Sequence, residues 1–329
     1  MPLPTIPISQ TQRAAQTLLA LAQGSAPLPT PPPLSSGQDA SADSQSSIRV
    51  VCISDTHCAY PEVPDGDLLL HTGDMTNKGT FDEIQAQLDW LKSLPHKTKV
   101  VIAGNHDNLL DTTFVENKPG PNIAPHGGET ARRRKGKGKA ELDWGAIVYL
   151  DNSAATVTVD LPGGEEAAPR KRSLKIFGSP WTPIMRGFPV YPFQYDPGAR
   201  DPWEGLIPDD TDIFLIHGPP RFHLDQNYGC EHLLREVWRA RPPLVVFGHV
   251  HAAHGEETVV YDTVRYWHMR AMTTQSWGSL LVLAFHAVLA RLGISGSRSP
   301  ETSRGEASHL VNSAVKSGDR KFDIISFDI

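Results

Sequence analysis

Residues 49–57 read RVVCISDTH, and this stretch decides the fold. The short β-branched run over residues 50–53 predicts a buried strand. Asp55 and His57 follow directly after the carboxyl end of this strand. Ligands of α/β sheets bind beyond the carboxyl ends of the strands, so both residues are candidates for a functional site.

The same order, an apolar run followed at once by polar residues, recurs four more times. The stretches are LLLHTGD (68–74), KVVIAGNHD (99–107), IFLIHG (213–218) and LVVFGHVH (244–251). Five strand ends of this kind can converge on one crevice.

Helices are expected between these strands. TFDE at residues 80–83 is a capping-box pattern that opens a helix ending before Pro95, and residues 231–239 form a second helical pattern. Towards the carboxyl end, residues 309–314 and 322–327 predict two closing strands.

Composition limits the class of protein. The chain has 329 residues, of which 39% are hydrophobic and 21% charged, a balance typical of globular proteins. The net charge of −6 argues against a general nucleic-acid binder, so no specific nucleic-acid partner is expected. A small anionic substrate remains compatible with it, because bound metal ions reverse the charge locally.

The cysteines and the apolar runs indicate a cytoplasmic protein. Three sparse cysteines, Cys52, Cys58 and Cys230, form no disulfide framework, and the first residues have no basic segment leading into an apolar stretch. The apolar run 280–290 is shorter than the roughly 20 residues that cross a bilayer. We therefore expect no transmembrane span and a buried or surface-docked helix there.

The domain boundary is expected near residue 48. Residues 1–47 are predicted to be a disordered or partly helical tail, with a short helix near 9–23. Deletion of residues 1–46 is expected to leave folding and turnover unchanged. Residues 48–329 form the main domain, with insertions near 117–140 and 256–307. The second insertion fits a lid, an oligomer contact or a membrane-facing helix.

Two further segments have two interpretations each. The basic run 132–139 is typical of a solvated loop, and it also fits a nuclear-localisation signal. Aromatic residues alternate with prolines over residues 178–195. Such a loop can stack a nucleobase or an aryl group, or its rings can pack over the sheet edge.

The polar residues at the strand ends suit metal binding. They offer carboxylate, amide and imidazole groups, which favour Mn²⁺, Fe, Zn²⁺ or Mg²⁺ over a thiolate-bound metal. Two divalent cations that lie close together repel each other, so one carboxylate must bridge them, and Asp74 after Gly73 suits that role. The seven candidate ligands are Asp55, His57, Asp74, Asn105, His217, His249 and His251.

The order D-x-H, G-D, G-N-H-D, a lone His and G-H-x-H resembles the calcineurin-like metallophosphoesterase superfamily, over most of residues 49–251. Within it, the stretches HTGD (71–74), GSPW (178–181) and HGPP (217–220) look like the metallophosphoesterase-domain, or brain-type, subfamily. The resemblance implies an α/β fold of two packed mixed β-sheets flanked by helices, with the metals at the strand ends.

The resemblance also implies a role for each candidate residue. One metal would be held by Asp55, His57, Asp74 and His251, and the other by Asp74, Asn105, His217 and His249. His106 and Asp107 would be catalytic: His106 would stand beside the phosphate, and Asp107 would orient its imidazole. Some mammalian members have Gly in place of His251 and are weak enzymes, whereas this chain has the complete set.

The implied activity is hydrolysis of a small phosphate ester by a metal-dependent phosphoesterase. The subfamily is associated with phosphodiesters and cyclic nucleotides, with two divalent ions, Mn²⁺ first, and attack by a metal-bridging hydroxide. Two alternatives remain: a protein Ser/Thr phosphatase, or a scaffold that keeps this fold without the chemistry.

Overall fold

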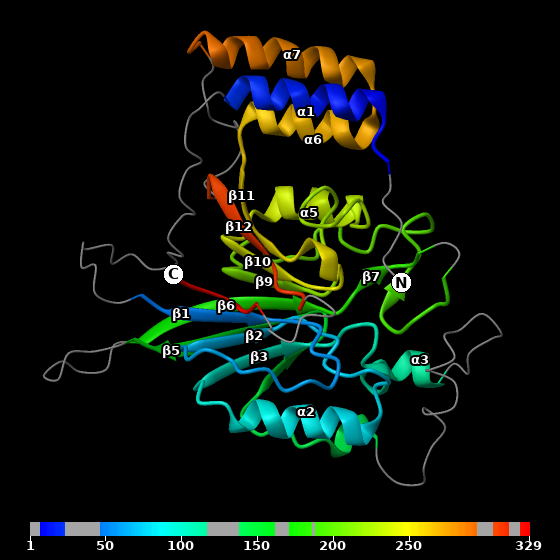
Figure 1. The fold of residues 1–329 in the computed structure, drawn as a ribbon, viewed down its shortest axis with the longest axis vertical. Coiled ribbons are helices and arrows are strands. Elements are labelled where there is room, and N and C mark those ends of the chain that lie inside the picture. The colour runs from blue at the N-terminus through cyan, green and yellow to red at the C-terminus, as the bar shows by residue number, and fades with distance from the viewer. Residues whose placement is uncertain are drawn as a thin grey trace, which may run out of the picture. The chain divides into compact units, whose positions relative to one another are not determined.

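The structure is a computed structural model that describes residues 7–23, 47–116, 138–161, 171–185, 188–294, 305–315 and 323–329. It contains both helices and strands (Figure 1). Its α-helices are α1 (Gln10–Gln23), α2 (Phe81–Ser93), α3 (Thr112–Glu116), α5 (Glu231–Ala240), α6 (Thr263–Thr274) and α7 (Trp277–Arg291). Its 3₁₀ turns are η1 (Asn108–Leu110), η2 (Lys139–Glu141) and η3 (His251–Ala253).

The strands form two large sheets and one small one. Strands β1 to β4 and β13 make the first sheet: β1 (Arg49–Ile53), β2 (Leu68–His71), β3 (Thr98–Ile102), β4 (Val148–Leu150) and β13 (Ile325–Asp328). The second sheet holds β5 (Ser153–Asp160), β6 (Lys171–Ser179), β9 (Ile213–Ile216), β10 (Leu244–Phe247), β11 (Gly255–Val260) and β12 (Ala307–Asn312). The short strands β7 (Thr182–Pro183) and β8 (Gln194–Tyr195) pair with each other.

Both large sheets are mixed. In the first, with order β13-β1-β2-β3-β4, the strands β1 to β4 are parallel and β13 is antiparallel to β1. In the second, with order β11-β12-β10-β9-β6-β5, β9 is parallel to β6 and β10, and β5 is antiparallel to β6. The two closing strands expected from the sequence are present, and they join different sheets.

The alternation of side chains explains why the sheets pack. In β1, Val50 and Cys52 face a core that also contains Ile176 and Leu215 of the second sheet, whereas Val51 and Ile53 point the other way. Successive residues of a strand face opposite sides, so one face of the first sheet meets the second sheet and the other meets α2. The predicted α/β arrangement of two packed mixed sheets flanked by helices is confirmed.

Helices cover the outer faces of this sandwich. Ile84, Leu88 and Leu91 of α2 lie on one face of the helix and pack on the first sheet. Thr80 and Glu83 form the predicted capping box, in which each side chain accepts a hydrogen bond from the backbone of the other. The second predicted helix is α5, which Figure 1 shows on the side of the second sheet.

Contacts within the chain define two compact units. The sandwich unit comprises Pro33–Glu257 and Leu310–Ile329, and the helical unit comprises Met1–Pro32 and Thr258–His309. This division differs from the boundary near residue 48 that the sequence suggests, and that boundary stays a proposal. Most of the insertion at 117–140 lies outside the described residues, as do most of the basic run 132–139 and residues 24–46 of the expected tail.

Within the helical unit, α1, α6 and α7 contact one another. The short helix expected near residues 9–23 is therefore present, and it has partners. Ala15 of α1 is fully buried, and Gln12 Nε2 donates a hydrogen bond of 2.9 Å to the carbonyl of Met272 on α6. None of the described helices is long and apolar enough to cross a bilayer.

These contacts reverse the expectation that residues 1–46 can be removed without effect on folding. Deletion of residues 1–23 exposes the surfaces of α6 and α7 that α1 covers, so we expect backbone amides of these two helices to exchange faster with solvent. Amides of β2 and β9, in the sandwich unit, serve as the internal control and should keep their protection. Hydrogen exchange followed by mass spectrometry measures both, and unchanged protection of α6 would contradict the docking of α1.

Candidate metal centre

The loops after β1, β2, β3, β9 and β10 carry all seven predicted ligands. Each ligand lies within four residues of the carboxyl end of its strand, because the apolar strand ends where the polar motif begins. The structure brings six of the seven into two groups of mutually close ligand atoms. These groups are Asp55, His57 and His251, and Asp74, His217 and His249.

The backbone at several ligands is in the left-handed region. The φ angle is +55° at Asp55, +44° at His57, +52° at Asp74 and +67° at His249. Residues other than glycine adopt this region rarely, and such residues cluster at functional sites.

Two glycines of the motifs make room for the carboxylates. A Cβ atom on Gly104 would lie 2.3 Å from Asp74 Oδ1, and one on Gly248 would lie 2.3 Å from Asp55 Oδ2. These approaches are far shorter than any side chain tolerates. The glycines before Asn105 and His249 are therefore required by the close passage of backbone and carboxylate.

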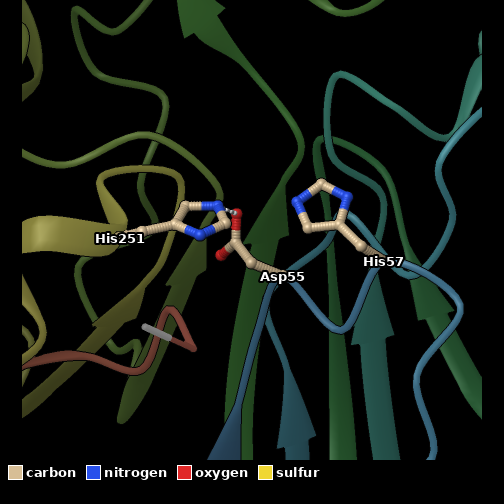
Figure 2. Close-up of side chains that lie close together, drawn as sticks. All are labelled: Asp55, His57 and His251. Carbon is tan, nitrogen blue, oxygen red and sulfur yellow. Dashed lines mark ion pairs between the residues drawn. The ribbon is translucent and has the colours of Figure 1, made fainter. Parts of the chain in front are cut away.

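The first group surrounds Asp55. Figure 2 shows its carboxylate between the rings of His57 and His251, and Asp55 Oδ1 lies 3.1 Å from His251 Nε2. The two imidazole rings stack at 5.3 Å. Asp55 Oδ1 is buried, and its ion pair with His251 leaves it with room for a further electrostatic partner. A cation at this group would satisfy it.

The second group surrounds His217. Its Nε2 atom lies 3.4 Å from Asp74 Oδ2 and 3.1 Å from Asn105 Oδ1, so the amide oxygen of the seventh ligand also faces this group. The ring of His249 lies 5.0 Å from that of His217. Carboxylate, amide oxygen and imidazole nitrogen together suit a divalent metal ion.

Asp74 connects the two groups. Its Oδ2 atom is 3.4 Å from His217 Nε2 in the second group and 4.0 Å from His57 Nε2 in the first. Its Oδ1 atom accepts a hydrogen bond of 2.7 Å from the backbone N–H of His106. A single buried carboxylate thus faces ligands of both groups, as the bridging role requires.

Backbone carbonyls orient two of the ligand imidazoles. Nδ1 of His57 lies 3.2 Å from the carbonyl of Thr76, and Nδ1 of His217 lies 2.8 Å from the carbonyl of Thr72. A carbonyl only accepts, so each Nδ1 donates to it, and Nε2 is the ring nitrogen that faces the ligand groups. Metal-binding histidines are commonly fixed in this way.

The electrostatics of the site favour bound cations. Burial lowers the pKa of His249 to about 4, so its ring is neutral and able to ligate. Burial opposes a charge on His217, but the carboxylate of Asp74 prevails and raises the pKa of His217 to about 9. The imidazolium of His217 stabilises the buried carboxylates in the absence of metal, the role that a cation takes over when it binds.

His106 lies beside the groups without belonging to either. Its Nδ1 atom is 2.9 Å from the carbonyl of Asn77, which leaves Nε2 free. Its ring lies 5.0 Å from the ring of His57 and 5.4 Å from that of Tyr191. The position suits a group that contacts a substrate next to the ions.

The expected contact between Asp107 and the imidazole of His106 is corrected by the structure. Asp107 accepts hydrogen bonds from the backbone N–H groups of Gly104, Met75 and Thr76 and from the Thr76 hydroxyl, at 2.8–3.3 Å. Burial, and then the charge of Asp74, raise the pKa of Asp107 to about 6. Asp107 holds two ligand loops together, and the carbonyl of Asn77 orients His106.

Sequence reasoning could not find the carbonyls of Thr72, Thr76 and Asn77, because every residue has a carbonyl and no side-chain signal marks these three.

The aromatic loop over residues 178–195 fits both of its interpretations in part. Phe193, Tyr195 and Trp181 pack inward, with Trp181 and Tyr195 against the buried Trp203, whereas Tyr191 stands next to His106.

Comparisons with known proteins agree with this geometry. The profile of the calcineurin-like phosphoesterase family matches residues 48–253. A probable rhamnogalacturonate lyase C of Emericella nidulans is 39% identical over 277 residues, which cover 83% of this chain and 23% of that protein. The human metallophosphoesterase domain-containing protein 1 is 33% identical over 216 residues, 63% of this chain and 61% of that protein.

The UPF0046 protein K07C11.7 of Caenorhabditis elegans is 36% identical over 217 residues, 63% of this chain and 65% of that protein. The chain thus spans less than two thirds of the length of each of these relatives. The family match covers every ligand loop from Asp55 to His251. The chain therefore belongs to the calcineurin-like phosphoesterase family.

Proposed function

We propose that the protein is a metal-dependent phosphoric ester hydrolase with a dinuclear centre, acting on small or nucleotide-like phosphodiesters. The observation that carries the proposal is the shared carboxylate: Asp74 Oδ2 faces His217 of one ligand group and His57 of the other. The seven ligands are Asp55, His57, Asp74, Asn105, His217, His249 and His251.

The donor set decides which ions fit. Four imidazole nitrogens, two carboxylates and one amide oxygen suit Mn²⁺ first, and also Fe, Zn²⁺ or Mg²⁺. When bound, a pair of such ions lowers the pKa of water and neutralises the charge of a phosphoryl group. The described cysteines, all of them free thiols, support a cytoplasmic protein.

The residues of the chain supply orientation and proton transfer. His106 presents a free Nε2 next to the ligand groups, and the hydrogen bond at its Nδ1 fixes the ring. A proton on Nε2 can pass to the leaving oxygen of the ester, or stabilise negative charge that develops on the phosphate. Asp107 contributes indirectly, because it ties the loop of Gly104 to the loop of Thr76.

Two observations weigh against the alternatives. A scaffold has no need of the complete ligand set, which here lies assembled around two buried carboxylates. A protein Ser/Thr phosphatase suits an open groove, whereas Tyr191 stands beside His106 and offers an aromatic face to a small ester. Both arguments support a small-molecule phosphoesterase.

A panel of substrates tests this function directly. With Mn²⁺ added, the full chain should hydrolyse bis-aryl phosphodiesters and cyclic nucleotides faster than a phosphopeptide, and chelation should abolish all turnover. Faster turnover of the phosphopeptide would favour the Ser/Thr phosphatase. No turnover of any ester with both ions bound would favour the scaffold.

The shared carboxylate can be separated from a ligand of one group. Asp74→Ala should lose both ions, because it removes the carboxylate that, among the described residues, faces both groups and leaves the two cations unshielded. His251→Gly should keep the second ion and lose only the first. Elemental analysis of the purified variants measures the ratio of metal to protein.

The exposed carboxylate Asp65 provides the matched control, since Asp65→Ala removes an acid without touching the centre. Its metal content should equal that of the wild type. Equal metal content in Asp74→Ala would mean that another residue bridges the ions.

The proton-transfer role predicts a dependence on the leaving group. His106→Ala should retain both ions and lower kcat by about 10²–10⁴-fold, more on alkyl esters than on nitrophenyl esters, since nitrophenolate leaves without a proton. His286→Ala, on helix α7 outside the sandwich unit, is the control histidine. Equal losses on all esters would point to charge stabilisation, and wild-type kcat would exclude His106 from the reaction.

A further inference from the structure

Helix α7 of the helical unit is apolar on two opposite sides. Leu280, Leu283 and Ala287 are buried, as expected for the side that packs on the neighbouring helices. The other side is exposed and equally apolar. Its large side chains are 58–71% exposed: Trp277, Leu281, Phe285, Val288, Leu292 and, just beyond the helix, Ile294.

This exposed face is continuous along the helix. Trp277, Leu281, Phe285, Val288 and Leu292 follow one another at intervals of three or four residues, so they form one stripe on the helix surface. The exposed positions of α7 from 277 to 288 hold only apolar side chains and Gly278. A continuous exposed apolar face of this kind marks a candidate interaction surface.

Charge identifies the kind of partner. The helical unit carries six arginines against three acidic residues, whereas the whole chain has a formal charge of −6. The arginines are Arg13, Arg265, Arg270, Arg291, Arg298 and Arg304, and the acids are Asp262, Glu301 and Glu306. Asp262 is paired with Arg265, which leaves Arg13, Arg270 and Arg291 exposed on the three helices. A basic unit with an apolar stripe complements an anionic lipid surface.

The length of α7 agrees with this partner. Fifteen residues are too few to cross a bilayer, and no described helix of the chain can do so. A helix of this length can lie in the interface with its apolar side among the acyl chains and its basic neighbours at the headgroups. Trp277 begins the helix and Arg291 ends it, and both residue types anchor helices at such interfaces.

A second copy of the chain fits less well. Two copies that met through α7 would bring two positively charged units together, and they would repel each other. Fifteen residues also correspond to about two heptads, fewer than the three or four over which helix pairing of this kind is specified. We propose that the exposed apolar face of α7 docks the protein on the surface of an anionic membrane.

Vesicle binding tests the proposal on the full chain. Wild-type protein should sediment with phosphatidylcholine vesicles that contain about 30% phosphatidylserine, and much less with pure phosphatidylcholine. The double variant Leu281→Gln, Phe285→Gln should bind the anionic vesicles at least about tenfold more weakly than the wild type, because glutamine keeps the helix and removes the apolar contact. Its hydrolytic activity should be unchanged, since both residues lie outside the sandwich unit.

Two controls separate the apolar contribution of α7 to vesicle binding from the contribution of the arginines. Tyr266→Gln changes an exposed aromatic residue on α6 and should leave vesicle binding unchanged. The triple variant Arg13→Gln, Arg270→Gln, Arg291→Gln should lose the preference for phosphatidylserine, and added salt should weaken binding of the wild type in the same way.

Three results would overturn the proposal. They are absence of wild-type binding to anionic vesicles, equal binding to neutral vesicles, and undiminished binding of the Leu281→Gln, Phe285→Gln variant. Sedimentation velocity measures whether the wild type and the variant form dimers. A wild-type dimer that this variant dissociates, without any vesicle binding, would assign the face to a second copy instead.

Discussion

The site depends on the buried carboxylate of Asp74. Oδ1 is held by the backbone N–H of His106 at 2.7 Å, and Oδ2 faces His217 and His57. A buried carboxylate is unfavourable unless positive charge or hydrogen-bond donors surround it. The neighbouring histidines hold the pKa of Asp74 well below its ordinary value against the effect of burial, so the residue is ionised before any cation arrives. The left-handed backbone at Asp74 and the glycine at position 104 follow from this placement.

The packing of the two sheets sets the distance between the ligands. Asp55 and Asp74 follow strands of the first sheet, whereas His217 and His249 follow strands of the second. The N–H of His249 donates a hydrogen bond of 2.9 Å to Asp55 Oδ2, which joins the two sheets at the site. A change in how the sheets pack would move one set of ligands relative to the other, so the core of the sandwich is also a determinant of the metal geometry.

Local sequence patterns account for the strand ends but not for contacts between distant segments. The five apolar runs predict both the strands and the positions of Asp55, Asp74 and His217, because each motif begins where its strand stops. The partners of His106 and Asp107 are set by how two loops meet, and the contact between their side chains that the family resemblance implies is not made in the folded chain. Helix α1 shows the same limit: Gln12 bonds a residue 260 positions away, which no local periodicity reveals.

Residues 256–307, which the sequence suggests are an insertion, are compatible with an intact centre because of where this segment leaves and re-enters the second sheet. Strands β11 and β12 are neighbours in the second sheet, so the chain departs along one and returns along the other. Near these ends, the hydroxyl groups of Tyr261 and Ser308 form a hydrogen bond of 2.6 Å. The backbone N–H of Tyr261 donates a second hydrogen bond, of 2.8 Å, to the carbonyl of Glu306. A segment whose two ends are joined in this way adds helices α6 and α7 at a small entropic cost and leaves the preceding ligand His251 in its loop. The fold can therefore acquire a separate surface for docking without disturbing the ligands that precede it.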